Sequence, residues 1–227
     1  MVSVLARSLS RLVFPEVCLG CGVPARDRLP VCASCLRRLP HASAEAIRAE
    51  LDARGTAAQD IRHAAALWQF DAGGTVQRVQ HALKYRGLPR IGVPLGGLIG
   101  GAFSETASAW RPDVVAPIPL ARTRQLERGY NQADGLAAGA AEALEARFEP
   151  GLMRRVRATR SQTRLSHAAR WANVQGAFTL HPDATVRGRR VLLIDDVIMT
   201  GATLLAAAEP LRAAGAEVSL AALAFAP

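Results

Sequence analysis

Residues 191–203 constrain the fold of this chain more than any other segment. The four apolar residues at 191–194 precede Asp195 and Asp196, and Thr200-Gly201-Ala202-Thr203 follows just before a helix-like stretch. Four successive apolar residues predict a strand that is buried on both faces, as in a parallel sheet. The carboxyl ends of such strands are where an α/β sheet presents its ligand site. The segment therefore predicts an α/β fold with a ligand site at the two aspartates.

The residue types in this segment suit a phosphorylated sugar. Two adjacent carboxylates repel each other and are costly to bury without a partner, which sugar hydroxyls or a divalent cation would supply. Small residues at 200–203 let backbone amides approach a phosphate, and the start of the following helix adds about half a positive charge. Threonine hydroxyls can donate to the same oxygens. We therefore predict that Asp195 and Asp196 bind a ribose and that its 5′-phosphate is bound by Thr200, Gly201, Ala202 and Thr203.

A second interpretation of the segment needs no ligand. Thr200 would be the N-cap of the following helix, and the two carboxylates would lie in a solvated loop. Capping alone explains neither the paired acids nor the second threonine, Thr203, so we favour the phosphate loop.

Apolar runs and helix-like segments alternate along residues 63–227. Strands are expected at residues 64–70, 113–118, 191–194 and 218–225, and helices at residues 76–85, 91–107, 128–147 and 201–214. This alternation predicts βαβ units and a mostly parallel sheet with flanking helices. Glycines are expected to loosen the helix at 91–107, and Pro210 is expected to kink the last helix or end it early.

Three regions of the chain differ in composition. Residues 1–40 hold all four cysteines, residues 41–62 are rich in Ala, Glu and Arg and are interpreted as a helical linker, and residues 63–227 form the α/β domain. Residues 1–17 alternate leucines with arginines, which indicates a short amphipathic helix and not a secretory signal. No apolar stretch is long enough to span a membrane, so we expect a cytoplasmic protein.

The cysteines form two C-x-x-C pairs that are separated by ten residues: Cys18 and Cys21, then Cys32 and Cys35. Two such pairs can supply the four thiolates of a tetrahedral zinc site. Disulfides are disfavoured in a cytoplasmic chain, and a redox pair would account for only one of the two motifs. We therefore predict a closed structural zinc site in a small zinc-ribbon-like module. This module would present four arginines to a partner: Arg26, Arg28, Arg37 and Arg38.

Excess positive charge points to an anionic partner. The formal net charge is +9, from 28 Lys and Arg against 19 Asp and Glu, and this balance favours nucleic acid or a phosphorylated small molecule. Several cations follow predicted elements at the sheet edge that carries the aspartates, and arginine binds phosphate with two bonds at once. We expect four of them to neutralise a diphosphate: Lys84, Arg122, Arg124 and Arg128. Lys84 has a second interpretation, as a cation that offsets the dipole at the end of its helix.

Six arginines and no acid lie between residues 151 and 170: Arg154, Arg155, Arg157, Arg160, Arg164 and Arg170. We interpret this stretch as a mobile hood that closes over the site and excludes water. A solvated basic loop and a nucleic-acid contact surface stay open as alternatives.

Residues 191–203 resemble the phosphoribosyl-diphosphate (PRPP) motif of the type I phosphoribosyltransferases, in which two acids precede a Thr/Gly-rich phosphate loop. The resemblance implies a twisted, mostly parallel sheet with flanking helices, a hood over the active site, and Mg²⁺ on the diphosphate. Met199 occupies the position at which the 6-oxopurine salvage enzymes carry an acid that acts as a base. A thioether cannot accept a proton near neutral pH, so we do not expect purine salvage by that route.

The order of motifs along nearly the whole chain resembles the ComF family of competence-associated phosphoribosyltransferase-like proteins. The motifs are Phe14-Pro15, the two cysteine pairs, and the runs at residues 83–87, 117–120, 128–132, 160–165 and 173–178, followed by the acidic motif. The resemblance implies a role in natural transformation, with single-stranded DNA and DNA-uptake proteins as partners. Similar proteins are often labelled amidophosphoribosyltransferase-like. This chain has no cysteine outside the two pairs, so it lacks the nucleophile for glutamine hydrolysis, and we reject glutamine-dependent amination.

Two functions agree with these observations. The first is an enzyme that transfers the phosphoribosyl group from PRPP to an acceptor, mainly through orientation and charge stabilisation. The second is a non-catalytic PRPP- or nucleotide-binding module that binds single-stranded DNA. Aromatic residues make up only 5% of the chain, which weakens the second function because base stacking needs them. The sequence leaves open the acceptor, the turnover of PRPP and the oligomeric state, with a homodimer as one alternative.

Overall fold

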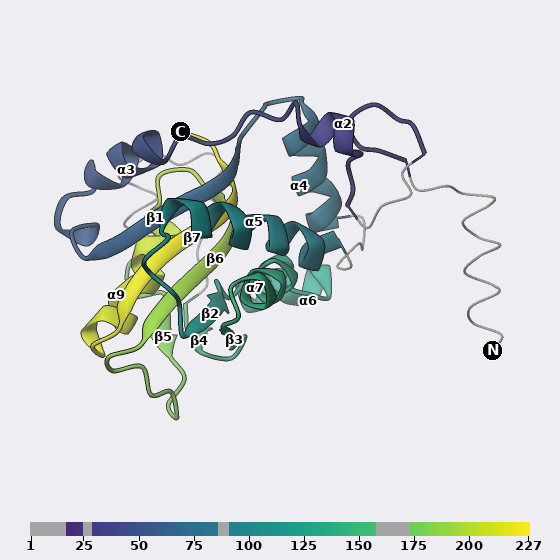
Figure 1. Ribbon diagram of the computed structural model, residues 1–227. Coiled ribbons are helices and arrows are strands. Elements are labelled where there is room, and N and C mark those ends of the chain that lie inside the picture. The colour runs from purple at the N-terminus through teal and green to yellow at the C-terminus, as the bar shows by residue number, and fades with distance from the viewer. Residues whose placement is uncertain (1–16, 25–28, 86–90, 158–172) are drawn as a thin grey trace.

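In the computed structural model, the chain folds around one five-stranded sheet. The structure describes residues 17–24, 29–85, 91–157 and 173–227. The strands, in their order across the sheet, are β1 (Ile61–Gln69), β7 (Glu217–Phe225), β6 (Arg190–Ile198), β2 (Val114–Pro117) and β3 (Arg147–Phe148). All neighbouring pairs in this sheet are parallel, which confirms the predicted α/β fold (Figure 1).

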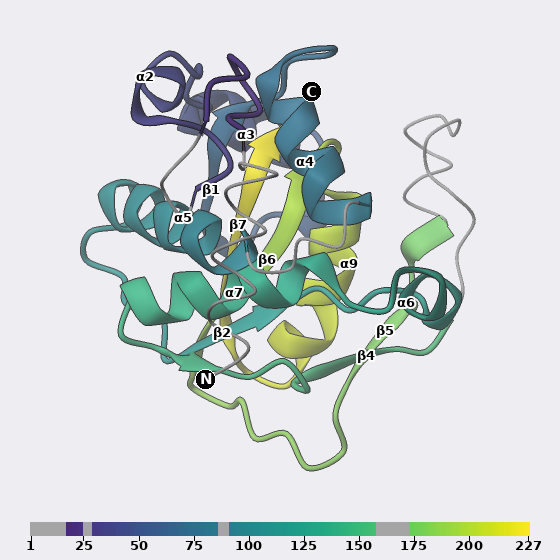
Figure 2. The same cartoon turned by 90° about the vertical axis from the view of Figure 1, so that its right-hand side faces the viewer.

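Helices cover both faces of this sheet (Figures 1 and 2). One face packs against α4 (Thr75–Tyr85), α5 (Gly92–Thr106) and α7 (Gln132–Ala143), and the other against α3 (Ala44–Asp52) and α9 (Ala202–Ala213). A cluster of buried apolar side chains fills the space on each face. Because both faces are covered, the central strands are apolar on both sides, as the run at residues 191–194 predicts.

Strand β6 extends further than the sequence predicts. We expected it to end at residue 194, but it runs to Ile198 and stays paired with β7 up to its last residue. The two aspartates therefore lie inside the strand and not in a loop beyond it. Successive strand residues point to opposite faces of the sheet. Asp195 therefore lies on the face that carries α9, and Asp196 lies on the face that carries α4. The prediction was too short because the two acids interrupt the apolar run.

The predicted helix at residues 128–147 is wrong in its extent. The chain instead forms α6 (Arg122–Arg128), which ends at Gly129 with a φ of 79°, a left-handed conformation that suits glycine. Helix α7 begins only at Gln132 and ends at Ala143, and Glu145 then turns the chain with a φ of 54° before β3. No residue of α6 is buried, so this helix has no apolar face. Hydrophobic periodicity therefore could not reveal the helix.

Two smaller differences concern the ends of elements. Strand β1 begins at Ile61, three residues before the predicted start at residue 64. Helix α9 does not end at Pro210 but continues to Ala213. Pro210 lies in the last turn of the helix, where the loss of one backbone donor removes a single hydrogen bond.

Glycines let α5 and α7 pack at unusually close range. A Cβ atom on Gly96 would clash with the carbonyl of Leu136, and one on Gly139 would clash with the carbonyl of Val93. We predicted that glycines would loosen α5, and the structure shows instead that they allow its backbone to contact α7. This contact fixes α7, whose first residue, Gln132, enters the candidate site described below.

The segment interpreted as a linker contributes to the core of the α/β fold. Helix α3 is capped by the Ser43 side chain, which accepts the N–H of Ala46. Ile47 and Leu51 on this helix are fully buried in the same apolar cluster as Leu193. A short 3₁₀ helix, η1 (Gly55–Ala57), then leads into β1. Residues 41–62 thus pack against the sheet.

The four cysteines lie in a small irregular module whose described residues include the short helix α2 (Ala33–Leu36). This module contacts α4, where Nε of Arg78 donates to the carbonyl of Leu19 at 2.7 Å. Its C-terminal end pairs with β1 through an isolated bridge between His41 and Trp68. Cys18 and Cys35 are buried in the apolar cluster that also contains residues of α4.

Several predictions lie outside the described residues: the N-terminal helix up to residue 16, Arg26, Arg28, the turn at 86–87, and the hood residues from 158 to 170. The described part of the predicted hood at residues 151–170 includes β4 (Met153–Arg155), which pairs antiparallel with β5 (Phe178–Leu180). None of the described helices is both long and apolar enough to cross a membrane.

Candidate functional site

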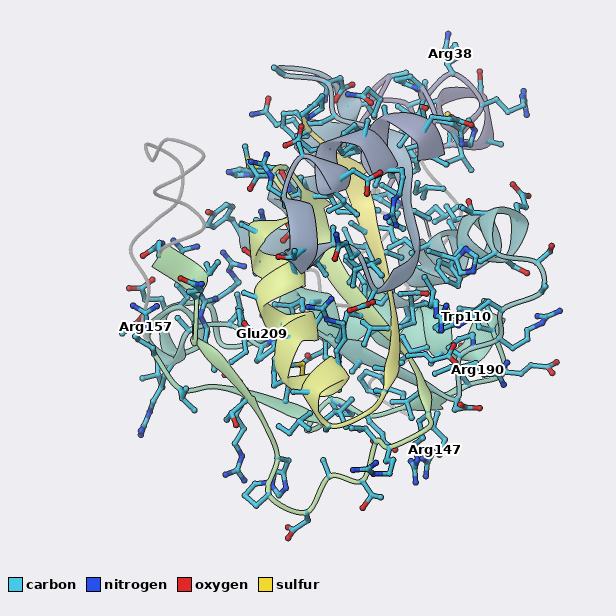
Figure 3. The ribbon with its side chains drawn as sticks, turned by 90° about the vertical axis from the view of Figure 1, so that its left-hand side faces the viewer. Arg38, Trp110, Arg147, Arg157, Arg190 and Glu209 are labelled. Atoms are coloured by element: carbon cyan, nitrogen blue, oxygen red, sulfur yellow. The ribbon has the colours of Figure 1, made fainter. Side chains whose placement is uncertain are left out.

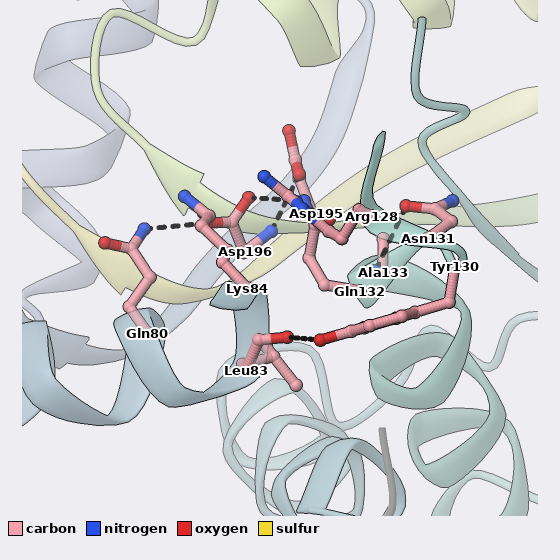
Figure 4. A network of polar contacts seen from close by, with 10 residues as sticks. All are labelled: Gln80, Leu83, Lys84, Arg128, Tyr130, Asn131, Gln132, Ala133, Asp195 and Asp196. Carbon is pink, nitrogen blue, oxygen red and sulfur yellow. Dashed lines mark hydrogen bonds and ion pairs between the residues drawn. The ribbon is translucent and has the colours of Figure 1, made fainter. Parts of the chain in front are cut away.

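Asp196 lies at the centre of a polar network that joins three elements (Figure 4). Nε2 of Gln80, on α4, donates to Asp196 Oδ2 at 2.7 Å, and Nε2 of Gln132, on α7, donates to Oδ1 at 3.2 Å. Lys84, also on α4, forms an ion pair with Oδ2. The Asp196 side chain is only 6% exposed, so these contacts supply the partners that a buried carboxylate needs.

The two aspartates differ in their pKa values. Burial raises the pKa of Asp195 well above its ordinary value, and the neighbouring charge of Asp196 raises it further. Burial acts in the same direction on Asp196, but Lys84 and the other donors outweigh it and hold its pKa at about 2. Asp196 is therefore the ionised member of the pair, and Asp195 is the member whose proton is easily retained.

The turn after β6 has the geometry of an anion-binding helix start. Gly201 precedes α9 with a φ of 69°, a conformation that other residues rarely adopt. The N–H of Ala202 points to Oγ1 of Thr200 at 3.4 Å, so Thr200 forms the cap-like contact of the second interpretation. The two carboxylates do not lie in a solvated loop, however, because Asp196 is buried and both belong to β6.

One cavity of about 240 Å³ brings most of the predicted site residues together. Its lining includes the acids, the phosphate loop and three of the four predicted cations: Asp195, Asp196, Thr200, Gly201, Ala202, Thr203, Lys84, Arg124 and Arg128. Met199 also lines the cavity. The space between the acids and the turn is therefore open to a ligand.

Arg122 is the predicted cation that does not line this cavity. It lines a separate shallow groove on the far side of α6, together with Gln125, Leu126 and Gly129. The helical phase explains the difference, because residues two apart point to nearly opposite sides of a helix and residues four apart share a side. Arg124 and Arg128 thus face the cavity together, and Arg122 does not.

Residues 128–132 hold the walls of the cavity in place. Tyr130 donates its hydroxyl to the carbonyl of Leu83 at 2.6 Å (Figure 4). Nδ2 of Asn131 donates to the carbonyl of Ile118 at 3.0 Å. Arg128 donates to Gln132 Oε1. The sequence interpretation included this run as a family motif but assigned no role to Gln132, which links Arg128 to Asp196.

Aromatic rings support two of the arginines at the cavity. The guanidinium of Arg128 lies 5.2 Å from the ring centroid of Tyr85, and that of Arg155 lies 5.1 Å from the ring centroid of Phe178. Arg155, from the predicted hood, lines the cavity. Burial lowers its pKa, and the nearby Asp195 opposes this shift. Arg155 is a site residue that the sequence placed in the hood but not in the binding set.

Other arginines surround this region on the surface. Arg154 and Arg157 are exposed, and Figure 3 shows Arg157 at the outer edge of the molecule, past the end of β4. The same view shows Arg38 projecting from the cysteine module at a distant point of the surface. The two predicted basic regions therefore do not form one patch through these residues.

The four cysteines form a cluster that can hold a metal ion. Their sulfur atoms all lie within 4.8 Å of one another, and those of Cys21 and Cys32 are 3.8 Å apart. Four thiolates around a zinc ion, at about 2.3 Å each, have sulfur–sulfur separations of about 3.8 Å. Burial tends to raise the pKa of Cys18, but backbone N–H groups bonded to its sulfur lower it to about 6, which favours the thiolate.

Comparisons with known proteins agree with this site. A sequence model of the phosphoribosyl transferase domain matches residues 135–227. The DNA utilization protein YhgH of Salmonella typhimurium is 29% identical over 225 residues, which cover 94% of this chain and 85% of that protein. Competence protein F of Haemophilus influenzae is 39% identical over 107 residues, which cover 47% of each chain.

A solved structure of the allosteric regulatory enzyme of purine biosynthesis aligns with 62% of this chain and 29% of the enzyme, at 26% identity and a TM-score of 0.40. The match to YhgH covers nearly the whole chain, and the domain match includes the acidic strand and the phosphate loop. This chain is therefore similar to the DNA utilization protein YhgH over nearly its whole length, and its phosphoribosyl transferase domain follows a four-cysteine cluster.

Proposed function

We propose that this protein binds PRPP in the cytoplasm, with the ribose at Asp195 and Asp196 and the 5′-phosphate at residues 200–203. One observation carries the proposal: the carboxylates and the turn before α9 line the same cavity. The N-terminus of α9 directs its backbone N–H groups and the positive end of its dipole at this turn. The match of residues 135–227 to the phosphoribosyl transferase domain supports the same ligand.

Cations around the cavity suit the diphosphate of PRPP. Lys84, Arg124, Arg128 and Arg155 line the cavity, and guanidinium groups can bind phosphate oxygens with two parallel bonds. Mg²⁺ that enters with PRPP would neutralise more of the diphosphate charge. One oxygen of Asp195 would bind this ion or a ribose hydroxyl. We assign no diphosphate contact to Arg122, because it faces away from the cavity.

We further propose that the bound PRPP transfers its phosphoribosyl group to an acceptor. The bond between C1′ and the diphosphate oxygen breaks, and its electron pair leaves with the diphosphate. A lone pair of the acceptor forms the new bond to C1′, and the acceptor proton passes to solvent. The side chains of this protein would orient the ribose and stabilise the negative charge that develops on the diphosphate.

A calorimetric titration of the full chain with PRPP and Mg²⁺ tests the proposed ligand, and an assay of diphosphate release tests the proposed transfer. We expect saturable binding at one site per chain, and diphosphate release that increases when the correct acceptor is present. A chain that does not bind PRPP contradicts the proposal. A chain that binds PRPP but releases no diphosphate with any acceptor supports the non-catalytic binding module.

A role in DNA utilization is the second candidate, and the names of the relatives favour it. Exposed arginines near the cavity, Arg154 and Arg157, could contact the phosphates of single-stranded DNA and make the affinity fall with salt. Replacing both by alanine is expected to weaken DNA binding and to leave PRPP affinity unchanged. With this second function we also propose that the chain binds proteins of DNA uptake and forms a homodimer.

The metal in the cysteine cluster is proposed to be zinc. All four ligands come from the protein, so the ion would be structural, with no position left for a substrate. We expect one zinc ion per chain by elemental analysis, and a loss of at least about 90% of it in Cys21→Ser, because three thiolates hold zinc far more weakly. Ser34→Ala, between Cys32 and Cys35 in α2, is the control and should keep its zinc. If the wild-type chain, purified under reducing conditions, contains no zinc, the assignment is contradicted.

A further inference from the structure

Helix α3 and the turn that follows it contact the phosphate loop from the side opposite the cavity. Nε of Arg54 donates to the carbonyl oxygen of Thr200 at 3.2 Å, across 146 positions of the sequence. A Cβ atom on Gly201 would clash with Cδ2 of Leu51. Neither Arg54 nor Leu51 lines the cavity, whereas Thr200 and Gly201 do. The loop therefore lies between this segment and the ligand site.

The bond from Arg54 determines the orientation of one peptide group. In a planar trans peptide, the C=O and the N–H point in opposite directions. Because the carbonyl of Thr200 points to Arg54, the N–H of Gly201 points away from α3. Gly201 lines the cavity, so its N–H is directed to the side on which the 5′-phosphate would bind. No backbone acceptor within the described residues takes this N–H.

This orientation needs a lock, because glycine allows the alternative. Gly201 has a φ of 69°, and glycine occupies both positive and negative φ regions at little cost. A flip of the peptide between Thr200 and Gly201 would direct a carbonyl oxygen at the phosphate, where it would repel the ligand. A fixed donor on the carbonyl opposes that flip.

Arg54 is itself held in place. Its guanidinium forms an ion pair with Glu50, one turn earlier on α3, and the two side chains are only 19% and 21% exposed. The backbone N–H of Arg54 also donates to the carbonyl of Leu51 at 2.8 Å. The donor that reaches Thr200 thus lies just after the end of α3, which is anchored in the core by Leu51.

We infer that Arg54 is a positioning residue, which locks the Thr200–Gly201 peptide so that the Gly201 amide faces the 5′-phosphate of the ligand. This inference rests on the proposed function. It makes α3, outside the matched phosphoribosyl transferase residues 135–227, part of the phosphate-binding apparatus.

The test compares Arg54→Met with wild type in three titrations: PRPP with Mg²⁺, ribose 5-phosphate, and inorganic diphosphate. Methionine keeps the apolar stem of the side chain and removes the donor. We expect the affinities for PRPP and for ribose 5-phosphate to fall by the same factor, about tenfold, because both ligands carry the 5′-phosphate. The affinity for inorganic diphosphate should stay unchanged. Arg54→Lys, which keeps a donor, should recover part of the affinity.

Arg48→Met is the matched control, because Arg48, on α3, makes the same two kinds of contact as Arg54, which follows that helix. Its Nη1 donates to the carbonyl of Ile61 at 3.0 Å, and it pairs with Asp52 one turn later. Its ligand affinities should equal those of wild type. Equal losses in Arg48→Met and Arg54→Met, or an equal loss for inorganic diphosphate, would overturn the inference. If Arg54→Met binds PRPP and ribose 5-phosphate as tightly as wild type, only this inference is overturned. If the wild-type chain binds neither PRPP nor ribose 5-phosphate, the proposed function is overturned as well.

Discussion

Asparagine at both positions 195 and 196 is expected to lower the affinity for PRPP with Mg²⁺ by at least about 100-fold. Asparagine has nearly the same shape as aspartate but carries no charge, so it weakens bonds to ribose hydroxyls and to the cation without changing the packing of β6. We expect Asp195 to release its proton when PRPP binds with Mg²⁺, so that both carboxylates are charged in the complex. Hydrogen bonds to a charged group contribute about 1.5–3 kcal/mol each. The loss of two such bonds exceeds a factor of 100 in affinity. Calorimetric titration of the double variant measures the effect.

The single variants separate the two aspartates. Asp196 already has three partners in the structure, from Gln80, Lys84 and Gln132, whereas the described side-chain contacts of Asp195 are fewer. Asp195→Asn should therefore affect the ligand with little change in the rest of the site, and Asp196→Asn should also disturb Lys84. Asp113→Asn is the control, because Asp113 bonds to Arg190 at the opposite end of β2 and β6. Unchanged PRPP affinity in the double variant would remove the site assignment.

The sequence predicted those parts of the fold that depend on neighbouring residues. The apolar runs of β2, β6 and β7 predict buried parallel strands, and the structure confirms that sheet. The two-residue spacing of the cysteine pairs predicts a cluster, and the four sulfur atoms meet. In both cases the information lies within a few residues, because burial on two faces and a metal-binding turn each require a local pattern.

Contacts between distant segments could not be predicted in the same way. Nothing in the residues near Asp196 indicates that Gln80 and Gln132 bond to it from two different helices. The bond from Arg54 to the phosphate loop could not be predicted either, because the segment around Arg54 is Ala/Glu/Arg-rich and resembles a linker. The role of each of these polar residues depends on the packing of whole helices, which the periodicity of one segment does not reveal.

Helical phase explains why Arg122 lies apart from Arg124 and Arg128. Clustered arginines after β2 were assigned to the site as a group, but the sequence Arg122–Arg128 forms α6 without an apolar face. Once that helix is known, its geometry separates Arg124 and Arg128, which line the cavity, from Arg122, which does not. The sequence interpretation treated this helical segment as a loop and therefore could not separate Arg122 from the other two arginines.

Removal of Lys84 is expected to have the largest effect on stability. The Lys84 side chain is 21% exposed and that of Asp196 is 6% exposed, so Lys84→Met would leave a buried carboxylate without its cation. Breaking one side of a buried ion pair costs about 3–5 kcal/mol. We expect about 3 kcal/mol at pH 7, at the lower end of this range, because Gln80 and Gln132 still donate to the carboxylate. Urea unfolding of both chains gives this difference in the free energy of unfolding.

The effect should depend on pH in a definite direction. The pKa of Asp196 is lowered to about 2 in the folded protein, below its ordinary value, so the unfolded chain binds its proton more readily. The ion pair therefore stabilises the fold fully above about pH 5, and this stabilisation is lost as the pH falls through 4 toward 2. The raised pKa of Asp195 contributes the opposite trend, and it should rise further in Lys84→Met because the charge of Lys84 lowers it in wild type. This second effect is also absent in acid, where Asp195 is protonated in both the folded and the unfolded chain. The difference between wild type and Lys84→Met should thus shrink in acid.

A double variant shows whether the lost charge is the cause. In Lys84→Met with Asp196→Asn, the buried group at position 196 is neutral and can still accept from Gln80 or Gln132, so most of the lost stability should return and its pH dependence should disappear. If Lys84→Met is as stable as wild type at pH 7, the pair does not hold Asp196 in its ionised form. The site would then have no preformed negative charge, and Lys84 would be free to serve the diphosphate alone. If the loss appears as expected, binding of PRPP must redistribute this pair, because the same ammonium group cannot fully neutralise both Asp196 and the departing diphosphate.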